Sequence, residues 1–257
     1  MTTTHSPDSH QDCPRLRLLG GFGLTVGEIA VPVVPGAQRL LAFLVLHAEP
    51  VSRAAAARDL WPGATPARAA ACLRSTLWRL MKWQLPLVTT TGDTLAADRA
   101  VSVDVWAVRA LAHEPGAHDI PGPEEVPSGL LGGELLPGWD EPWVAQEREW
   151  FRQVRLRTLE MLSERYRRTG DLYLAHKTAV AAVRADPLRE SAHRALVELH
   201  LADGNPAEAV RQFHHYRALV RRELGLDPSP AISGLVHHLV AERPRPVSMA
   251  GNAGSLN

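Results

Sequence analysis

The sequence predicts a mainly helical α+β protein made of two parts with different architectures. In the first part, two short strands precede three helices and a hairpin, which is the element order of a winged helix-turn-helix. The second part is helical throughout. Gly170 and Gly204, which separate successive helices, are 34 residues apart, and Ala175 and Ala209 keep the same offset. That period is typical of tetratricopeptide helix pairs. We therefore expect an N-terminal winged helix-turn-helix followed by an all-α tetratricopeptide-like bundle.

The overall composition favours no polyanionic or polycationic partner. The 257 residues carry 28 Lys or Arg and 28 Asp or Glu, so the formal net charge is zero and any electrostatic function must be local. No apolar leader and no run of about 18 uncharged apolar residues occurs, which predicts a cytoplasmic protein with no membrane contact. The two cysteines, Cys13 and Cys72, form no CxxC pair, which argues against a disulfide scaffold or a structural zinc site.

A segment rich in proline and glycine separates the two parts of the chain. Residues 112–140 hold five prolines and six glycines and show no lasting periodicity, which indicates a domain boundary near residue 114. The end of this segment is apolar, which favours a docked linker over a free one. The expected division is a disordered tail at 1–14, a winged helix-turn-helix at 15–114, a docked linker at 115–140, a helical domain at 141–241 and a disordered tail at 242–257.

The first part is predicted in detail by its strand formers and helix caps. Two strands lie within 16–34 and join around Gly27, and the strongly apolar helix 38–47 is expected in the core. Ser52 is a candidate N-cap for a second helix over 52–61, and Thr65 with Pro66 begins a third over 66–83. A hairpin over 87–97, a short strand and a helix over 104–113 complete this part.

Five helices are predicted in the second part, each bounded by Gly, Asp or Pro signals. They cover 141–168, 172–185, 189–202, 206–223 and 230–241. The second and fourth of these contain the residues that keep the 34-residue offset. These helix pairs carry no catalytic or nucleotide motif, and repeat stacks of this kind usually act through a protein-binding surface, so the expected role of this part is contact with a partner and not chemistry.

The third helix has one apolar face and one cationic face. Residues 36–83 carry seven basic and two acidic side chains, and none of the acidic ones lies between Ala64 and Gly92. Leu73, Leu77 and Leu80 share the apolar face of a helical wheel. A solvated helix face normally mixes charge signs, so an all-cationic face at this place in a winged fold indicates a recognition helix for the DNA major groove. A cationic helix that merely keeps the surface soluble is the alternative.

Trp78, Cys72 and a cluster of tryptophan and acidic residues each allow two interpretations. Trp78 lies at the flank of the cationic face, and packing against a neighbouring helix or the wing is favoured over contact with DNA. Cys72 is favoured as a small filler over a redox sensor. The cluster of Trp139, Asp140, Trp143, Glu147 and Trp150 is expected to be the packed face of a long helix, with a partner surface as the alternative.

Both parts of the chain resemble the SARP family of actinobacterial transcriptional activators. The first part carries LLGGFGLTVGEIAV, QRLLAFLVLHAEPVSR, RDLWP, LRSTLWRL and VDVWAVRAL. The second carries GGELLPGWDEPWVAQERE, RYRRTGDLYLAHKTAVAAVRADPLRESAHRAL and RALVRRELGLDPSP, which are similar to the bacterial transcriptional activator domain of that family. The resemblance covers about residues 15–240 in continuous order. It implies an OmpR-type winged helix and a bundle of tetratricopeptide type.

The resemblance also implies a function and the residues that carry it. The expected protein binds direct repeats in double-stranded DNA near promoters as a homodimer, and it recruits RNA polymerase holoenzyme to genes of secondary metabolism such as antibiotic biosynthesis. It would be associated with the nucleoid. The DNA-binding positions implied are Arg68, Arg74, Ser75, Arg79 and Lys82 on the recognition helix, with Thr90 and Thr91 in the wing at 90–93. The wing lacks the common Gly-Tyr pair and any basic residue before Arg99.

No motif in the sequence supports an enzyme. Nucleotide-binding and nucleophile motifs of the types GxxxxGK[ST], GxGxxG and GxSxG are missing, so we expect a small-form family member with no catalytic residue and no cofactor. The adjacent pairs at 214–215 and 237–238 point in different directions on a helix, which favours surface histidines over a metal site. The second hypothesis for the function is a helical-repeat interaction protein with weak or no specific DNA binding.

Overall fold

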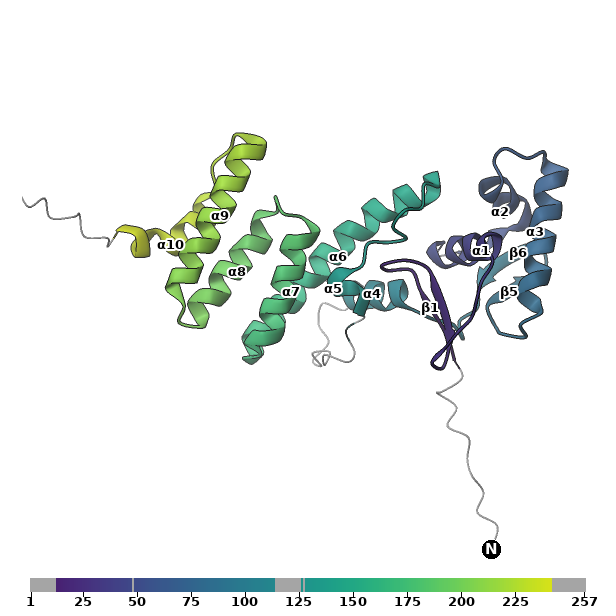
Figure 1. Cartoon of the computed structure of the whole chain (residues 1–257), viewed down its shortest axis with the longest axis horizontal. Helices are drawn as coiled ribbons and strands as arrows, with labels where there is room; N and C mark the ends of the chain where they lie inside the picture. Colours follow the sequence, from purple (N-terminus) through teal and green to yellow (C-terminus); the bar gives the residue numbers. More distant parts are fainter. Residues whose placement is uncertain (1–12, 48, 114–125, 127, 242–257) are drawn as a thin grey trace, which may run out of the picture. The chain divides into compact units, whose positions relative to one another are not determined.

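The computed structural model describes residues 13–47, 49–113, 126 and 128–241 (Figure 1). The chain divides into two compact units, Met1–Met161 and Leu162–Asn257, here called unit 1 and unit 2. Residues 1–12 and 242–257 of the predicted tails, and residues 115–125 and 127 of the predicted linker, lie outside the described residues. Within those residues, no helix combines the length and the apolar composition that crossing a membrane requires.

Unit 1 begins with a four-stranded sheet in the order β3-β2-β1-β7. Its strands are β1 (Pro14–Arg17), β2 (Gly23–Val26), β3 (Ile29–Ala30) and β7 (Ser102–Val103). β1 pairs antiparallel with β2 and parallel with β7, so the start of the winged part is joined to its end. Three strands therefore replace the two expected around Gly27, because β1 and β2 are separate strands and the turn at Gly27 joins β2 to β3.

The core of unit 1 is α1 (Pro35–Leu46), which is buried on almost every side. It contacts α2 (Arg53–Leu60) and α3 (Pro66–Met81), and all three helices lie beside the second sheet (Figure 1). That sheet has the order β4-β6-β5 and consists of β4 (Val51–Ser52), β5 (Val88–Thr91) and β6 (Thr94–Ala97). The β5–β6 hairpin that follows α3 is the wing of a winged helix-turn-helix.

Residues 128–161 belong to unit 1, and their start packs on the segment that follows β1. Here α4 (Asp104–His113) is followed by α5 (Ser128–Gly132) and the first part of α6 (Pro142–Thr169). The amide of Gly20 donates to the carbonyl of Glu134 at 2.8 Å, and the amide of Leu136 donates to Leu18 at 2.9 Å. A Cβ at Gly129 would lie 2.4 Å from that of Leu19, so this close approach requires glycine.

The buried leucines of this segment explain why the structural division lies after Met161 and not near residue 114. Leu130, Leu135 and Leu136 are almost completely buried. Arg148 donates to the carbonyl oxygens of both Leu135 and Leu136, which fixes the segment to the start of α6. The domain bounds inferred from the sequence thus stay a prediction, whereas contacts group 128–161 with the winged part.

Unit 2 consists of the end of α6 and four further helices, α7 (Leu172–Ala185), α8 (Glu190–Ala202), α9 (Pro206–Leu224) and α10 (Pro230–Ala241). Each packs on its neighbours in the chain. Gly170 and Gly204 both have positive φ angles in the turns that precede α7 and α9, and Ala175 and Ala209 are both completely buried. The 34-residue offset therefore marks equivalent positions in successive helix pairs.

Candidate nucleic-acid interface

The helix α3 is fixed at its start by a capping pair and along its length by an apolar stripe. The Thr65 hydroxyl accepts a hydrogen bond from the amide of Arg68, and Pro66 occupies the first helical position, where a missing amide costs least. The buried residues are Ala69, Leu73, Thr76, Leu77 and Leu80. They face α1 and α2, so the orientation of the opposite face is set by the core.

All five α3 residues predicted to contact DNA are exposed. Arg68, Ser75, Arg79 and Lys82 fall within a sector of about 60° at 100° per residue, and Arg74 lies on the flank nearer the wing. Within the described chain, no ion pair is found for the side chains of Arg68, Arg74, Arg79 or Lys82. The helix therefore presents guanidinium and ammonium groups that no carboxylate neutralises.

The expectation that Trp78 is packed is wrong for most of its surface. The side chain is 58% exposed and lies between the cationic face and the wing. The Lys82 ammonium lies 3.8 Å from the centroid of its ring, which is a cation–π contact. The indole thus holds one of the cations predicted to contact DNA over its face, and another part of its surface lines the groove beside the wing.

The wing presents hydroxyl groups and a carboxylate in place of cations. Thr90 and Thr91 are exposed on β5, and the turn between β5 and β6 uses Gly92 at φ 57°. Asp93 is exposed beside them, and its carbonyl accepts a hydrogen bond of 2.8 Å from the Arg53 amide. This bond ties the wing to the start of α2. The position of the wing beside α3 is therefore fixed, but its exposed turn carries no positive charge, unlike α3.

A groove lies between α3 and the wing. The α3–wing groove has a volume of about 330 Å³. Its lining comprises Arg53, Arg74, Leu77, Trp78, Leu80, Met81, Leu85, Leu87, Val88 and Thr90. Arg53 and Met81 were not predicted from the sequence to lie in this region, because Arg53, Met81 and Thr90 come from three different elements. The helical period does place the exposed Arg74, Trp78 and Met81 on one flank of α3.

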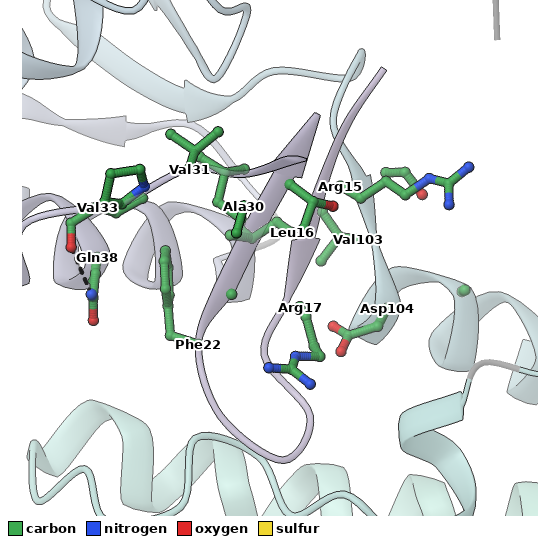
Figure 2. A pocket seen from close by; sticks show the side chains of 16 residues that line it. Arg15, Leu16, Arg17, Phe22, Ala30, Val31, Val33, Gln38, Val103 and Asp104 are labelled. Carbon is green, nitrogen blue, oxygen red and sulfur yellow. Dashed lines mark hydrogen bonds between the residues drawn. The ribbon is translucent and has the colours of Figure 1, made fainter. Parts of the chain in front are cut away.

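A larger hollow of about 1100 Å³ lies on the β3-β2-β1-β7 sheet (Figure 2). Arg17 and Asp104 lie near one another at its edge. The Asp104 carboxylate accepts hydrogen bonds from the amides of Leu18, Leu19 and Val105 at 2.8–3.0 Å, so it joins β1 to α4. Burial raises the pKa of Asp104, while these hydrogen bonds and the Arg17 charge oppose that shift. The Asp104 carboxylate at this hollow therefore has a structural role.

The aromatic cluster at the start of α6 is packed at two of its three tryptophans. Trp143 meets Phe43 edge to face at a centroid distance of 5.4 Å and contacts Trp139 at 6.4 Å. Trp150 departs from the expected packed face because its side chain is 43% exposed, with the Arg109 guanidinium 4.5 Å from its ring centroid. Most of the cluster therefore serves the packing of unit 1.

The histidines of unit 2 form no metal site among the described residues. His214, His215, His237 and His238 are exposed, and no group of three or more His, Cys, Asp or Glu side chains in the described ranges has the geometry to hold a metal ion. His193 differs because it is completely buried in α8, with its ring nitrogens 2.9 Å from the Pro187 carbonyl and 2.8 Å from the Gln212 amide.

Comparison with known proteins supports both halves of this architecture. Residues 128–240 match the bacterial transcriptional activator domain, and the matching regulators below cover most of the chain. The chain thus carries a match to this activator domain over 113 of its 257 residues, and over most of its length it is similar to regulators of the SARP type. It is 27% identical over 243 residues to the regulatory protein AfsR of Streptomyces coelicolor, an alignment that covers 85% of the chain and 23% of AfsR. It is 26% identical over 251 residues to AfsR of Streptomyces griseus, covering 92% of the chain and 26% of that protein.

A solved structure shows the same fold. Mycobacterium tuberculosis EmbR, determined in complex with a low-affinity phosphopeptide, superposes on 91% of this chain and 66% of its own with a TM-score of 0.64 and 19% identity. The chain thus spans about a quarter of the length of the two AfsR relatives. The predicted fold class, a winged helix-turn-helix with a mainly helical remainder, is confirmed.

Proposed function

We propose that this chain is a sequence-specific transcriptional activator of the SARP type that inserts α3 into the DNA major groove. The carrying observation is the exposed set of Arg68, Arg74, Arg79 and Lys82, for which the described structure holds no ion pair. Arginine pairs bidentately with guanine, and lysine contacts phosphate as a point charge. The capped and buried opposite face of α3 holds these groups in fixed positions, which sequence readout requires.

The family context supports the remaining parts of the proposal. Two copies bind direct repeats about one helical turn apart, and the bound chain recruits RNA polymerase holoenzyme. The controlled genes are of the antibiotic-biosynthesis class, and the protein acts in the cytoplasm at the nucleoid. In the wing, Thr90 and Thr91 contact the DNA backbone through their hydroxyl groups. These two weak donors add little affinity beside the cations of α3.

Three single variants of the full chain test the proposal on a duplex selected from a randomised pool. Arg79→Ala should lower specific affinity by about 1–3 kcal/mol if Arg79 reads a base. Lys82→Ala should weaken all sequences alike and reduce the slope of log affinity against log salt by about one unit. The matched control is Arg58→Ala, which also removes an exposed guanidinium from the winged part, but one that is paired with Asp59 at 2.8 Å.

Arg58→Ala should bind the duplex as the unmodified chain does. If Arg79→Ala and Lys82→Ala also bind as tightly as the unmodified chain, α3 is not the recognition helix. If selection enriches no sequence at all, the result favours the second hypothesis. In that hypothesis the chain acts through protein contacts alone. An insertion of half a helical turn between the two repeats should abolish joint occupancy in a footprint, because the second copy would then face the opposite side of the duplex.

A further inference from the structure

The α3–wing groove combines an apolar interior with cations at its rim. Leu77, Leu80 and Leu87 are buried beneath it and form an apolar floor. Trp78 and Met81 form one wall, and they are two of the large apolar side chains that unit 1 leaves most exposed, at 58% and 74%. Exposed apolar groups three positions apart on a helix lie side by side, so they make a continuous surface.

Two guanidinium groups border this surface. Arg53 at the start of α2 and Arg74 on α3 both line the groove, and within the described residues neither has an ion-paired carboxylate. The nearby Thr90 hydroxyl adds a donor. The volume of about 330 Å³ lies at the lower end of the range of about 300–1,000 Å³ found for small-molecule sites. A phosphate group of DNA matches the rim but not the leucine floor.

We propose that the α3–wing groove binds a small anionic aromatic molecule, whose ring system lies on the leucine floor beside Trp78 and whose anionic group pairs with Arg53 and Arg74. Because Arg74 also belongs to the DNA-facing set, the ligand and DNA exclude one another. The mutual exclusion of ligand and DNA rests on the proposed function, whereas the binding of the ligand does not. Such a ligand would release the protein from its operator.

The test uses two fluorescent probes that share one ring system. Anilinonaphthalene sulfonate carries a sulfonate, and its desulfonated analogue phenylnaphthylamine is neutral. Titrated into the full chain without DNA, the sulfonate should bind about tenfold or more tightly than the neutral probe. Arg53→Gln should reduce this preference by weakening the sulfonate alone, because Arg74 remains as the second cation. Arg99→Gln removes an exposed guanidinium outside the groove and should leave both probes unchanged.

Two further variants report on the apolar part of the site. Val88→Trp fills the groove from the wing and should abolish binding of both probes. Met81→Ala shortens an exposed wall residue, so the fold tolerates it, and it should weaken both probes several-fold. The proposal is overturned if the two probes bind equally well, or if Arg53→Gln and Met81→Ala bind both as the unmodified chain does.

Competition with DNA separates this inference from the proposed function. Saturating sulfonate probe should release the selected duplex, and the neutral probe at the same concentration should release less. If the probe occupies the groove and the duplex stays bound, mutual exclusion is wrong. If no duplex binds in the absence of probe, the proposed function fails while the probe titrations still decide the groove.

Discussion

Exposed arginines occur on α3 of unit 1 and on the helices of unit 2, but their surroundings differ. In unit 2, Arg167 and Arg168 both pair with Glu164, and Arg211 pairs with Glu208. On α3, Arg68, Arg74 and Arg79 find no such partner within the described chain, because no acidic residue lies between Ala64 and Gly92. In the first arrangement each guanidinium group has a carboxylate partner on its own helix. The second is open to an external anion.

The difference affects helix stability as well as binding. Intrahelical pairs three or four residues apart contribute about 0.2–0.5 kcal/mol each, and like charges at these spacings cost a similar amount. Hydrogen bonds from arginine lower the pKa of Glu164 and of Glu208, so these carboxylates stay charged to lower pH. Unit 2 thus uses its arginines for its own structure, whereas α3 keeps Arg79 and Lys82 as a repulsive pair three positions apart.

Truncation of unit 1 has the largest expected effect on stability. It tests whether the winged part folds without residues 128–161. A fragment of residues 15–114 lacks Leu130, Leu135 and Leu136, which are almost fully buried in the full chain. Each contributes about 1.5–3 kcal/mol as an upper estimate. Their combined loss approaches the total stability of a domain, about 5–15 kcal/mol. We expect this fragment to show no cooperative thermal transition by circular dichroism.

A fragment of residues 13–161 is the control for that truncation. It retains the buried leucines and the three hydrogen bonds from Arg148 to the carbonyl oxygens of Leu135, Leu136 and Trp139. It should unfold cooperatively. Equal melting of the two fragments would show that 128–161 does not stabilise the winged part, and the division near residue 114 would then be the better one.

Charge reversal on α3 should produce the next largest effect. The double variant Arg68→Glu/Arg79→Glu places two carboxylates where the duplex carries phosphates, so specific affinity should fall by more than about 2–6 kcal/mol, the sum expected for two lost base contacts. The matched control swaps a pair in unit 2, Glu208→Arg/Arg211→Glu, which keeps both the charge and the pairing. That control should bind DNA normally in the same gel-shift titration. A similar loss in both variants would mean that the effect does not come from α3.

Unit 2 also pairs a buried histidine within its own structure, because both ring nitrogens of His193 have hydrogen-bond partners. Burial lowers the pKa of His193, and the charge of His215 lowers it further against the opposing Pro187 carbonyl. A folded pKa below the unfolded value means that the stabilisation is present above about pH 6.5 and is lost as the pH falls through the folded pKa. The free energy of unfolding of α8 and α9 should therefore fall between about pH 7.5 and about pH 5.5.

Hydrogen exchange of peptides from α8 and α9, corrected for intrinsic rates, measures this loss. Tryptophan fluorescence does not report on it, because all seven tryptophans lie at or before Trp150. His193→Asn retains a polar side chain without a titrating group and should flatten the pH dependence. His215→Asn, at an exposed neighbouring position, should leave most of it in place. If the slope persists in His193→Asn, another group titrates.

Local sequence signals were sufficient to predict most helices and the exposure of the cationic face of α3. Caps at Ser52 and Thr65 act over three residues, and both are present as hydrogen bonds in the structure. The exposure of Arg68 and Arg79 follows from the helical period, since the opposite face is a leucine stripe. Helix caps and exposed helix faces depend on residues within one or two turns, so they can be predicted from the local sequence.

Contacts between distant segments were not predictable in the same way. β4 is only two residues long, and α5 contains two glycines, so neither has a propensity signal of its own. The packing of Gly129 and Gly133 on Leu19 and the association of Arg53 with Arg74 both depend on tertiary placement. Trp78 was misjudged for the same reason, because an indole at the edge of an apolar face is buried only if a neighbour reaches it.

The smallest expected effect is also the most direct test of the comparison, because it measures stability where function is not involved. Arg79→Ala relieves repulsion with Lys82 and replaces arginine with the best helix former, so the unfolding free energy should stay unchanged or rise by a few tenths of a kcal/mol. Arg211→Ala also gains helix propensity, but it loses the pair with Glu208 and should be no more stable than the unmodified chain. Urea titrations followed by circular dichroism, repeated at high salt, measure both. High salt should screen the charge terms and bring the two variants together. If Arg79→Ala is instead the less stable variant, then Arg79 has a structural role, and the loss of DNA binding in that variant would have to be attributed to the fold of α3.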